Sequence, residues 1–390
     1  MRTHRFLGRQ DIADRIVRVL QRGQAGQPYL FSGPEGSGKE ATALEIARLV
    51  NCSAPADCRA DALCESCRKA VTFQHPDIRW IGPAPAGLED PGKSDLVREI
   101  LDGKAANPFH VPDFTASSQV LIGNPDHPGP LTVRSVIQFL RRRSFQGRWK
   151  VAVVADCQRM NTAAANAFLK TLEEPPDASL IFMLTTGTAG MLPTILSRCQ
   201  QVLFEPYPEE QMAAILDHLA ADADPVRRGE AVRLADGNAR RALALLDDET
   251  AALRRWAEQI YVSLGEGMTG AGQAAAEHLQ AGTMPASVTG GDAARISDLA
   301  LKRRRAILFC ETLAMLLAET VACRERGDRW RPRAAGAADL VRQAAMTLPV
   351  PGLLAAIARV EQAKHELGGN LNIGLVTAVM LQDVGDHVRA

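Results

Sequence analysis

The stretch Tyr29-Leu-Phe-Ser-Gly33-Pro-Glu-Gly-Ser-Gly38-Lys39-Glu40 decides the fold of the N-terminal part of the chain. It joins a short apolar run to a glycine-rich turn, and the following segment 41–50 carries apolar residues at helical spacing. A strand, a glycine loop and a helix in this order open a parallel α/β sheet. The spacing G-x-x-x-x-G-K is typical of a phosphate loop, whose backbone N–H groups hold phosphate at a helix N-terminus. The candidate phosphate-binding residues are Gly33, Gly36, Gly38 and Lys39.

Glu40 occupies the position after the lysine, where the motif has a Ser or Thr hydroxyl that ligates Mg²⁺. A carboxylate could contact the metal, but it is longer and adds negative charge beside the phosphates. The simpler interpretation is that Glu40 is a favourable first-turn residue at a helix N-terminus. The sequence therefore predicts a degraded site, at which ATP and Mg²⁺ binding is possible but compromised.

A second acidic position follows the buried run Val151–Ala155, which ends at Asp156. In P-loop NTPases this strand usually ends in a carboxylate linked to the metal; the alternative is that Asp156 caps a turn. An ATPase of the AAA+ type would have a glutamate base next, and this chain has Cys157 instead. Loss of a general base typically slows a reaction by ~10²–10⁴-fold, so we expect weak hydrolysis or none.

Apolar and β-branched runs predict more strands, and helical periodicity predicts the helices between them. The predicted strands are 78–81, 150–155, 179–186 and 201–204, and the predicted helices are 132–143, with Thr132 as N-cap, and 161–174. Residues 82–130 are rich in Pro, Gly and Asp, which indicates an inserted surface loop. No strand pattern follows Pro208. We therefore expect an α/β domain over 1–206 and helical units over 207–247 and 248–390.

The chain has 390 residues, with 45 Lys and Arg against 45 Asp and Glu. A formal net charge of zero argues against a polybasic tail or a globally basic nucleic-acid-binding protein. The N-terminus lacks the apolar stretch of a signal peptide, and no uncharged apolar window of about 18 residues predicts a membrane span. We expect a cytoplasmic protein with no membrane partner, whose thiols stay reduced.

Four of the eight cysteines lie within the module 52–67, with the spacing C-x5-C-x5-C-x2-C. Four thiolates satisfy the tetrahedral preference of Zn²⁺ in a closed structural site, and the metal would stabilise a loop that has little core. The alternatives are a redox pair at Cys64 and Cys67, or unrelated thiols. The predicted zinc ligands are Cys52, Cys58, Cys64 and Cys67.

Two further motifs resemble the clamp-loader ATPase subunits of bacterial DNA polymerase III. The segment Asn161-Thr-Ala-Ala-Ala-Asn-Ala-Phe-Leu-Lys-Thr-Leu-Glu-Glu-Pro-Pro176 is similar to the helix after the second acidic motif of that family. The segment Ser197-Arg198-Cys199 is similar to its Ser-Arg-Cys motif. The resemblance covers most of the chain but not 82–130. It implies an AAA+ domain with a parallel sheet, then a small helical lid and an all-α collar that oligomerises a ring.

Within this family, Glu40 and Cys157 place the chain nearer the delta-prime branch than the gamma/tau motor branch, which keeps a Ser or Thr and an Asp-Glu pair. The resemblance implies a stator beside the gamma/tau and delta subunits of a clamp loader. The assembled complex would load the sliding clamp on primer-template DNA as part of the DNA-directed DNA polymerase holoenzyme. The subunit itself would be a weak or inactive ATPase.

The resemblance also implies roles for single residues. Arg198 would act in trans as an arginine finger on the γ-phosphate of a neighbouring subunit, and the alternative is a surface ion pair. Thr185 or Thr186 would sense the γ-phosphate, with an N-cap role as the rival. Arg240 would face the nucleotide from the lid, or would be a solvated helix arginine. The family also carries a cysteine module at this place, although its usual pattern has a cysteine where this chain has Asp61.

Three hypotheses remain open: a delta-prime-type clamp-loader subunit, a catalytically active AAA+ ATPase, and a zinc-dependent nucleic-acid adaptor that has kept only the fold. The active ATPase would be a gamma/tau-like motor or a branch-migration helicase. Glu40 and Cys157 argue against the active ATPase, and the intact Ser-Arg-Cys motif argues against the adaptor. The basic runs 141–143 and 302–305 are interpreted as solvated faces, since no aromatic residues are interleaved with them.

Overall fold

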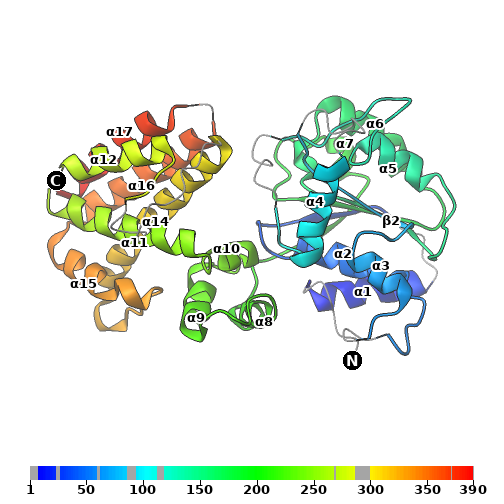
Figure 1. The fold of residues 1–390 in the computed structure, drawn as a ribbon, viewed down its shortest axis with the longest axis horizontal. Coiled ribbons are helices and arrows are strands. Elements are labelled where there is room, and N and C mark those ends of the chain that lie inside the picture. Colours follow the sequence, from blue (N-terminus) through cyan, green and yellow to red (C-terminus); the bar gives the residue numbers. More distant parts are fainter. Residues whose placement is uncertain are drawn as a thin grey trace. The chain divides into compact units, whose positions relative to one another are not determined.

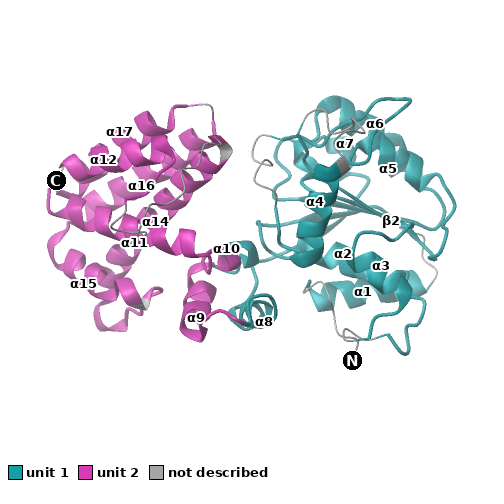
Figure 2. Ribbon diagram, viewed as in Figure 1, with its two compact units in different colours: residues 1–221, 236–241 teal, residues 222–235, 242–390 magenta. Residues whose placement is uncertain are grey.

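The computed structural model describes residues 8–22, 27–58, 62–85, 94–111, 118–267, 269–285, 299–369 and 371–389. The chain forms two compact units (Figure 2). Unit 1 holds residues 1–221 and 236–241, and unit 2 holds residues 222–235 and 242–390. The predicted lid, residues 207–247, is shared between the two units. The predicted domain boundaries after residues 206 and 247 therefore stay a prediction.

Unit 1 contains a five-stranded sheet whose paired strands are all parallel (Figure 1). The strand order is β2-β3-β4-β1-β5. The strands are β1 (Tyr29–Ser32), β2 (Ile78–Ile81), β3 (Lys150–Val154), β4 (Ser179–Thr185) and β5 (Gln200–Leu203). Every residue of β3 and β4 is buried, as expected for continuous apolar runs inside a parallel sheet. The predicted α/β fold with a parallel sheet is confirmed.

Helices connect these strands, and α2 and α5 pack against the sheet. The helices of unit 1 are α1 (Gln10–Gln21), α2 (Lys39–Val50), α3 (Glu65–Val71), α4 (Ser94–Ala106), α5 (Val133–Leu140), α6 (Thr162–Glu173), α7 (Pro193–Leu196) and α8 (Glu209–Leu219), with a 3-10 turn η3 (Cys157–Arg159). Thr132 caps α5 in a capping box with Ser135, as predicted, because the two residues bond each other's backbone N–H. Asn161 caps α6 by accepting from the N–H of Ala164 (2.9 Å).

The prediction of a loop over the whole of 82–130 is wrong for Ser94–Ala106, which forms α4. Proline and glycine cluster on both sides of this segment, but the segment itself has no proline and spaces Val97, Ile100 and Leu101 along a helix face. Ile100 is buried in unit 1. The surrounding residues 86–93 and 112–117 lie outside the described part of the chain.

Unit 2 is helical throughout its described residues, as predicted. Its elements are α9 (Pro225–Leu234), α11 (Asp248–Gly265), α12 (Thr269–Ala281), α14 (Leu299–Arg326), η4 (Gly327–Arg329), η5 (Ala335–Ala337), α15 (Ala338–Thr347), α16 (Val350–Gly368) and α17 (Ile373–Arg389), while α10 (Ala239–Ala244) spans the division between the units. The long helix α14 packs on α11, α15 and α16, and α17 packs on α12 and α16. Trp256, Phe309 and Leu313 are buried in this core.

Among the described residues, one helical segment is long and apolar enough to cross a membrane by length and composition alone. It is Leu301–Arg329, which covers most of α14 and the whole of η4. Half of its most apolar window is buried inside the protein, and a core helix passes the same test. The basic run at its start is also not a simple solvated face. Arg305 is buried, and its Nε donates to Oε1 of Glu249 (3.1 Å).

Candidate nucleotide site, cysteine module and family

Three of the predicted motifs meet at the carboxyl edge of the sheet. The phosphate loop follows β1, Asp156 follows β3, and Thr186 follows β4. Register pairs Ser32 with Thr185, so the ends of β1 and β4 lie side by side. Ligands of open α/β sheets bind at this edge, because the loops after parallel strands converge there.

The glycines of the phosphate loop are required by its geometry. Gly36 (φ 68°) and Gly38 (φ 85°) adopt left-handed backbone conformations that other residues rarely take. A Cβ on Gly36 would clash with the Asn238 side chain, and a Cβ on Gly38 would clash with the hydroxyl of Tyr207. The loop is therefore closely covered by residues that follow β5.

The ammonium of Lys39 bonds to its own loop. Its Nζ donates to the carbonyl oxygens of Gly33 (2.8 Å) and Pro34 (2.6 Å) and lies 3.3 Å from Oγ of Ser37. Burial lowers the pKa of Lys39 to about 8, and nearby carboxylates, Asp156 foremost, limit the decrease. The lysine would have to leave these carbonyls to reach a bound phosphate.

Glu40 is paired with a lysine from the inserted segment. Nζ of Lys104, on α4, lies 2.6 Å from Oε1 of Glu40, donates to the carbonyl of His110 (3.0 Å) and stands 4.7 Å from the Trp80 ring centroid. Burial raises the pKa of Glu40, and the Lys104 ammonium opposes this increase. At the position where the motif supplies a metal ligand, the chain thus holds a carboxylate already neutralised by its own cation.

The turn after α4 also covers the phosphate loop. Pro108, Phe109 and His110 line the same small cavity as Lys39 and Glu40. The Phe109 ring stands edge-on to Tyr207, with centroids 6.3 Å apart. This cavity measures about 80 Å³, whereas ligand pockets are commonly ~300–1,000 Å³. The cavity beside the phosphate loop is therefore small for a nucleotide site.

The second acidic motif lies beside this cavity. Asp156 (φ 47°) lines it and accepts from Nε2 of Gln158 (3.3 Å), which also donates to Oγ1 of Thr186 (3.1 Å). Cys157 points into the core, where burial foremost raises the pKa of its thiol. Of the two candidate sensor threonines, Thr186 lines the cavity. The Thr185 hydroxyl is buried and bonds the backbone of Gly187 instead.

The two predicted arginines lie in different surroundings. Arg240 lines the cavity and forms an ion pair with Glu35 of the phosphate loop. Arg198 does not line it. Its Nη2 lies 2.6 Å from Oε1 of Glu173 at the end of α6, and its Nη1 donates to the Thr194 carbonyl (2.9 Å). The Arg198 side chain is 32% exposed, while its Nε is buried and has no hydrogen-bond partner among the described residues. Arg198 is thus held at the surface, away from its own nucleotide site.

The four predicted cysteine ligands come together. Sγ atoms of Cys52, Cys58, Cys64 and Cys67 all lie within 4.8 Å of one another. Cys52 and Cys64 sulfurs are 3.8 Å apart, and tetrahedral zinc with Zn–S bonds of about 2.3 Å places sulfurs about 3.8 Å apart. The backbone N–H of Cys64 donates to Sγ of Cys58 (3.4 Å), and Arg48 donates to Sγ of Cys67 (3.3 Å). The donor set and its spacing fit a zinc ion.

Two helices position this module. Cys52 follows the end of α2, and Cys64 is the residue before α3. Oγ of Ser66 donates to the Asn51 carbonyl (2.6 Å), which joins the first turn of α3 to the end of α2. Asp61, where the family pattern has a cysteine, lies outside the described residues. Cys58 supplies the fourth sulfur despite its different position in the sequence.

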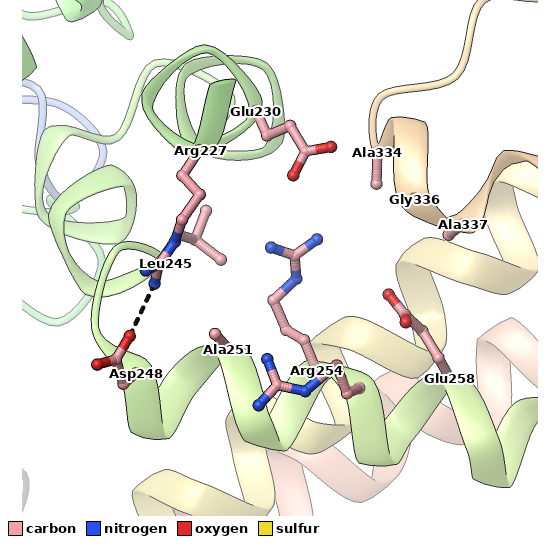
Figure 3. A pocket seen from close by; sticks show the side chains of 11 residues that line it. Arg227, Glu230, Leu245, Asp248, Ala251, Arg254, Glu258, Ala334, Gly336 and Ala337 are labelled. Atoms are coloured by element: carbon pink, nitrogen blue, oxygen red, sulfur yellow. Dashed lines mark hydrogen bonds and ion pairs between the residues drawn. The ribbon is translucent and has the colours of Figure 1, made fainter. Parts of the chain in front are cut away.

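A second cavity, of about 390 Å³, lies within unit 2 (Figure 3). Its walls carry charges of both signs, and the guanidinium of Arg227 pairs with Asp248 (3.1 Å). Burial raises the pKa of Glu258, which also lines it. The opposite charges largely balance, so this cavity offers no defined site for one class of ligand.

A protein family described as "DNA polymerase III, delta subunit" matches residues 8–208. The matched segment is more than half of the chain and contains the phosphate loop, the cysteine module and Arg198. The chain belongs to the DNA polymerase III delta subunit family. This membership agrees with the resemblance inferred from its motifs.

This family member is similar to named subunits from several bacteria. It is 29% identical over 199 residues to the delta′ subunit of DNA polymerase III from Pseudomonas aeruginosa, a match that covers 51% of the chain and 48% of the relative. The delta′ subunit of Escherichia coli is 26% identical over 236 residues, with 60% and 59% covered. The gamma/tau subunit of Mycobacterium tuberculosis is 28% identical over 249 residues, with 62% and 36% covered. The chain therefore spans between about a third and three fifths of these relatives.

Among solved structures, a gamma subunit-related protein of DNA polymerase III from Thermotoga maritima aligns with this family member at a TM-score of 0.47 and 16% identity. The alignment covers 97% of the chain and 99% of that protein.

Sequence reasoning missed the residues that cover the phosphate loop of this family member. Lys104 and Phe109 lie in the segment predicted as a loop, and Tyr207 belongs to no motif. One signal was present for Lys104. A carboxylate at the start of a buried helix needs a positive partner, so Glu40 itself indicated that a cation would lie near it.

Proposed function

We propose that this chain is a delta-prime-type subunit of a DNA polymerase III clamp loader. It would act as a stator beside the gamma/tau and delta subunits, in a complex that loads the sliding clamp on primer-template DNA in the cytoplasm during replication. Membership of the delta subunit family and the two delta′ relatives support this proposal.

The observation that carries the stator role is the state of the nucleotide site. Lys104 neutralises Glu40 at the metal-ligand position, Cys157 replaces the glutamate base, and the cavity beside them measures about 80 Å³. Two separate parts of the hydrolysis machinery are altered. A subunit with this site would contribute to hydrolysis only through residues that it presents to a neighbour. Arg198, half-buried and held by Glu173, is the residue that we assign to that role.

The chain alone is expected to turn over no ATP above the background rate, because the metal ligand and the base are both missing. Mixed with purified gamma/tau and delta subunits, it is expected to form a complex whose DNA-stimulated turnover exceeds that of the mixture without it. Steady-state release of phosphate, measured with and without the chain, checks both statements. Robust turnover by the chain alone would refute the stator role.

The second candidate function is that of a gamma/tau-like motor subunit. It rests on the gamma/tau relative of Mycobacterium tuberculosis, which matches 62% of the chain. The phosphate-loop lysine and Asp156 are present, as a motor subunit requires. The same turnover measurement separates the two candidates, since a motor subunit hydrolyses ATP without help from a stator.

We also propose that the cysteine module holds one structural Zn²⁺. The four sulfurs converge, and a backbone N–H and Arg48 donate to two of them. Such donors stabilise thiolates, the form that binds metal. A bound zinc ion would tie α2 to α3, and would contribute directly to the stability of this part of unit 1.

Replacing Cys64 with serine is expected to lower the zinc content from about one ion per chain to near zero, because three thiolates hold structural zinc far less tightly than four. Elemental analysis of the purified protein measures this directly. Cys323→Ser removes a cysteine from α14 and is expected to leave the zinc content unchanged. A wild-type protein that is folded and free of metal would overturn the zinc proposal.

A further inference from the structure

The segment 141–149 between α5 and β3 concentrates positive charge. Its sequence Arg-Arg-Arg-Ser-Phe-Gln-Gly-Arg-Trp has four arginines and no acidic residue, in a chain whose formal charge is zero. All four arginines are exposed. Within the described part of the chain, none of their side chains forms a hydrogen bond or an ion pair. We call this segment the arginine loop.

An aromatic side chain stands among these arginines. Phe145 is 81% exposed. The helix predicted through Arg143 ends at Leu140 instead, so the arginines and Phe145 share one loop. The loop therefore presents a large apolar ring to water among cations.

A buried carboxylate holds the loop in shape. Asp77 is fully buried and accepts the backbone N–H groups of Phe145 (2.7 Å), Gln146 (2.7 Å) and Gly147 (2.6 Å). The Lys150 ammonium lies 2.8 Å from the same carboxylate. Burial would raise the pKa of Asp77, but these four donors outweigh it and hold the pKa at about 2. The carboxylate is therefore ionised at neutral pH.

A second anchor holds the end of the loop. Asn51 donates to the Trp149 carbonyl (3.0 Å) and accepts from the Trp149 N–H (3.0 Å). The side chain of Gln146 also accepts from Nζ of Lys69 on α3 (3.3 Å). The backbone under Phe145 is thus fixed by hydrogen bonds to α3, to the residue after α2 and to the residue before β2. Little backbone freedom remains to be lost on binding.

We propose that the arginine loop binds single-stranded nucleic acid, with Phe145 stacking on a base and the arginines contacting phosphates. Proteins that bind single strands without sequence preference combine a positive surface with aromatic side chains on which bases stack. Guanidinium groups without acidic partners are free to contact phosphate oxygens. This function is additional to the stator role, and it can be tested on the chain alone.

Single strands fit the loop better than the two obvious alternatives. A duplex keeps its bases stacked inside, so it could satisfy the arginines but not Phe145. An acidic peptide would also satisfy the arginines, but it offers no aromatic face to Phe145. The combination of an exposed aromatic ring on an anchored backbone and free guanidinium groups therefore favours unpaired bases on a phosphate backbone.

Fluorescence anisotropy of a labelled oligo(dT) of about 20 nucleotides with the full chain tests the proposal, because this length exceeds the site size of a typical single-strand-binding fold. We expect binding at low salt that weakens steadily as NaCl is added, and weaker binding of a duplex of the same length. Phe145→Ala is expected to weaken oligo(dT) binding about tenfold, since a stacked base contributes substantially. Arg142→Ala/Arg143→Ala is expected to reduce the slope of log affinity against log salt by about 1.4.

A positioning variant tests whether loop geometry matters. Asp77→Asn removes a negative charge, so electrostatics alone would strengthen binding; we expect weaker binding, because the loop backbone loses its anchor. Lys302→Ala/Arg304→Ala removes two cations from α14 as a matched control and is expected to leave binding unchanged. Circular dichroism verifies that each variant is folded, and Phe145→Ala provides the test if Asp77→Asn is not.

Three results would overturn the proposal. One is no binding of oligo(dT) at low salt. Another is equal loss of binding in the α14 control and the arginine-loop variant. The third is competition by a polyglutamate peptide at the same concentration as oligo(dT), together with an unchanged affinity in Phe145→Ala, which would indicate an acidic protein partner instead.

Discussion

Replacing Arg198 with alanine is expected to slow ATP hydrolysis by about 10³-fold or more at the neighbouring active site that receives this arginine in an assembled complex. A planar guanidinium with fixed charge stabilises the transferring phosphoryl group through paired hydrogen bonds. In the part of the chain that the structure describes, Arg198 does not line the cavity of its own subunit, and its Nε has no hydrogen-bond partner. Single-turnover hydrolysis by the reconstituted complex, with wild-type or variant chain, measures the effect.

Two variants sharpen this test. Arg198→Lys keeps the charge but loses the paired geometry, so most of the defect is expected to remain. Arg15→Ala removes an exposed arginine from α1 of the same unit and is expected to leave hydrolysis unchanged. Assembly is followed by gel filtration, so that a failure to join the complex is not taken for a catalytic defect. Unchanged single-turnover rates in the Arg198→Ala complex would refute the proposal that Arg198 acts as an arginine finger.

Replacing Lys104 with methionine is expected to lower the free energy of unfolding by about 2–3 kcal/mol, because it leaves the partly buried Glu40 carboxylate without its cation. The Lys104 side chain is 3% exposed and that of Glu40 is 21% exposed, so solvent screens this pair weakly. Urea unfolding followed by circular dichroism measures the change. The cation–π contact with Trp80 is lost in the same variant.

A double-mutant cycle separates the ion pair from these other contacts. Glu40→Gln/Lys104→Met is expected to be more stable than Lys104→Met alone, because the double variant buries no unpaired charge. Arg342→Ala, which removes an exposed ion pair with Asp339, serves as a control and is expected to leave stability unchanged. If the effects of Glu40→Gln and Lys104→Met on the free energy of unfolding simply add in the double variant, Glu40 and Lys104 do not pair directly.

The sheet and its edge could be predicted because their signals are local. The buried strands are continuous apolar runs, and Thr132 and Asn161 cap the helices that their sequence positions suggest. The four cysteine ligands also lie within one short segment. In each case, the residues that decide the structure are near one another in the sequence.

The cover of the phosphate loop could not be predicted, because it depends on contacts between distant segments. Lys104 and Glu40 are 64 positions apart, and nothing in either local pattern fixes their meeting. The amino-acid composition also gave a wrong prediction, since the prolines and glycines on both sides of 94–106 indicated a loop where α4 carries Lys104. At the end of β4, adjacent side chains point to opposite sides, so only one of Thr185 and Thr186 can face the phosphate site. The sequence alone does not show which of the two does.

The position of β1 between β4 and β5 bears on how a newly made chain reaches its fold. Tyr29 pairs with Phe182 on β4 and with Gln200 on β5. During synthesis, β1 therefore leaves the ribosome about 150 residues before the strands that pair with it. At ~5–20 residues per second, an apolar strand stays without its neighbours for roughly 8–30 s during synthesis. Proteins with such long-range strand pairing fold slowly, and their apolar segments are exposed to aggregation until the strands pair. Recovery of active protein from denaturant should therefore depend on chain concentration and on the presence of chaperones.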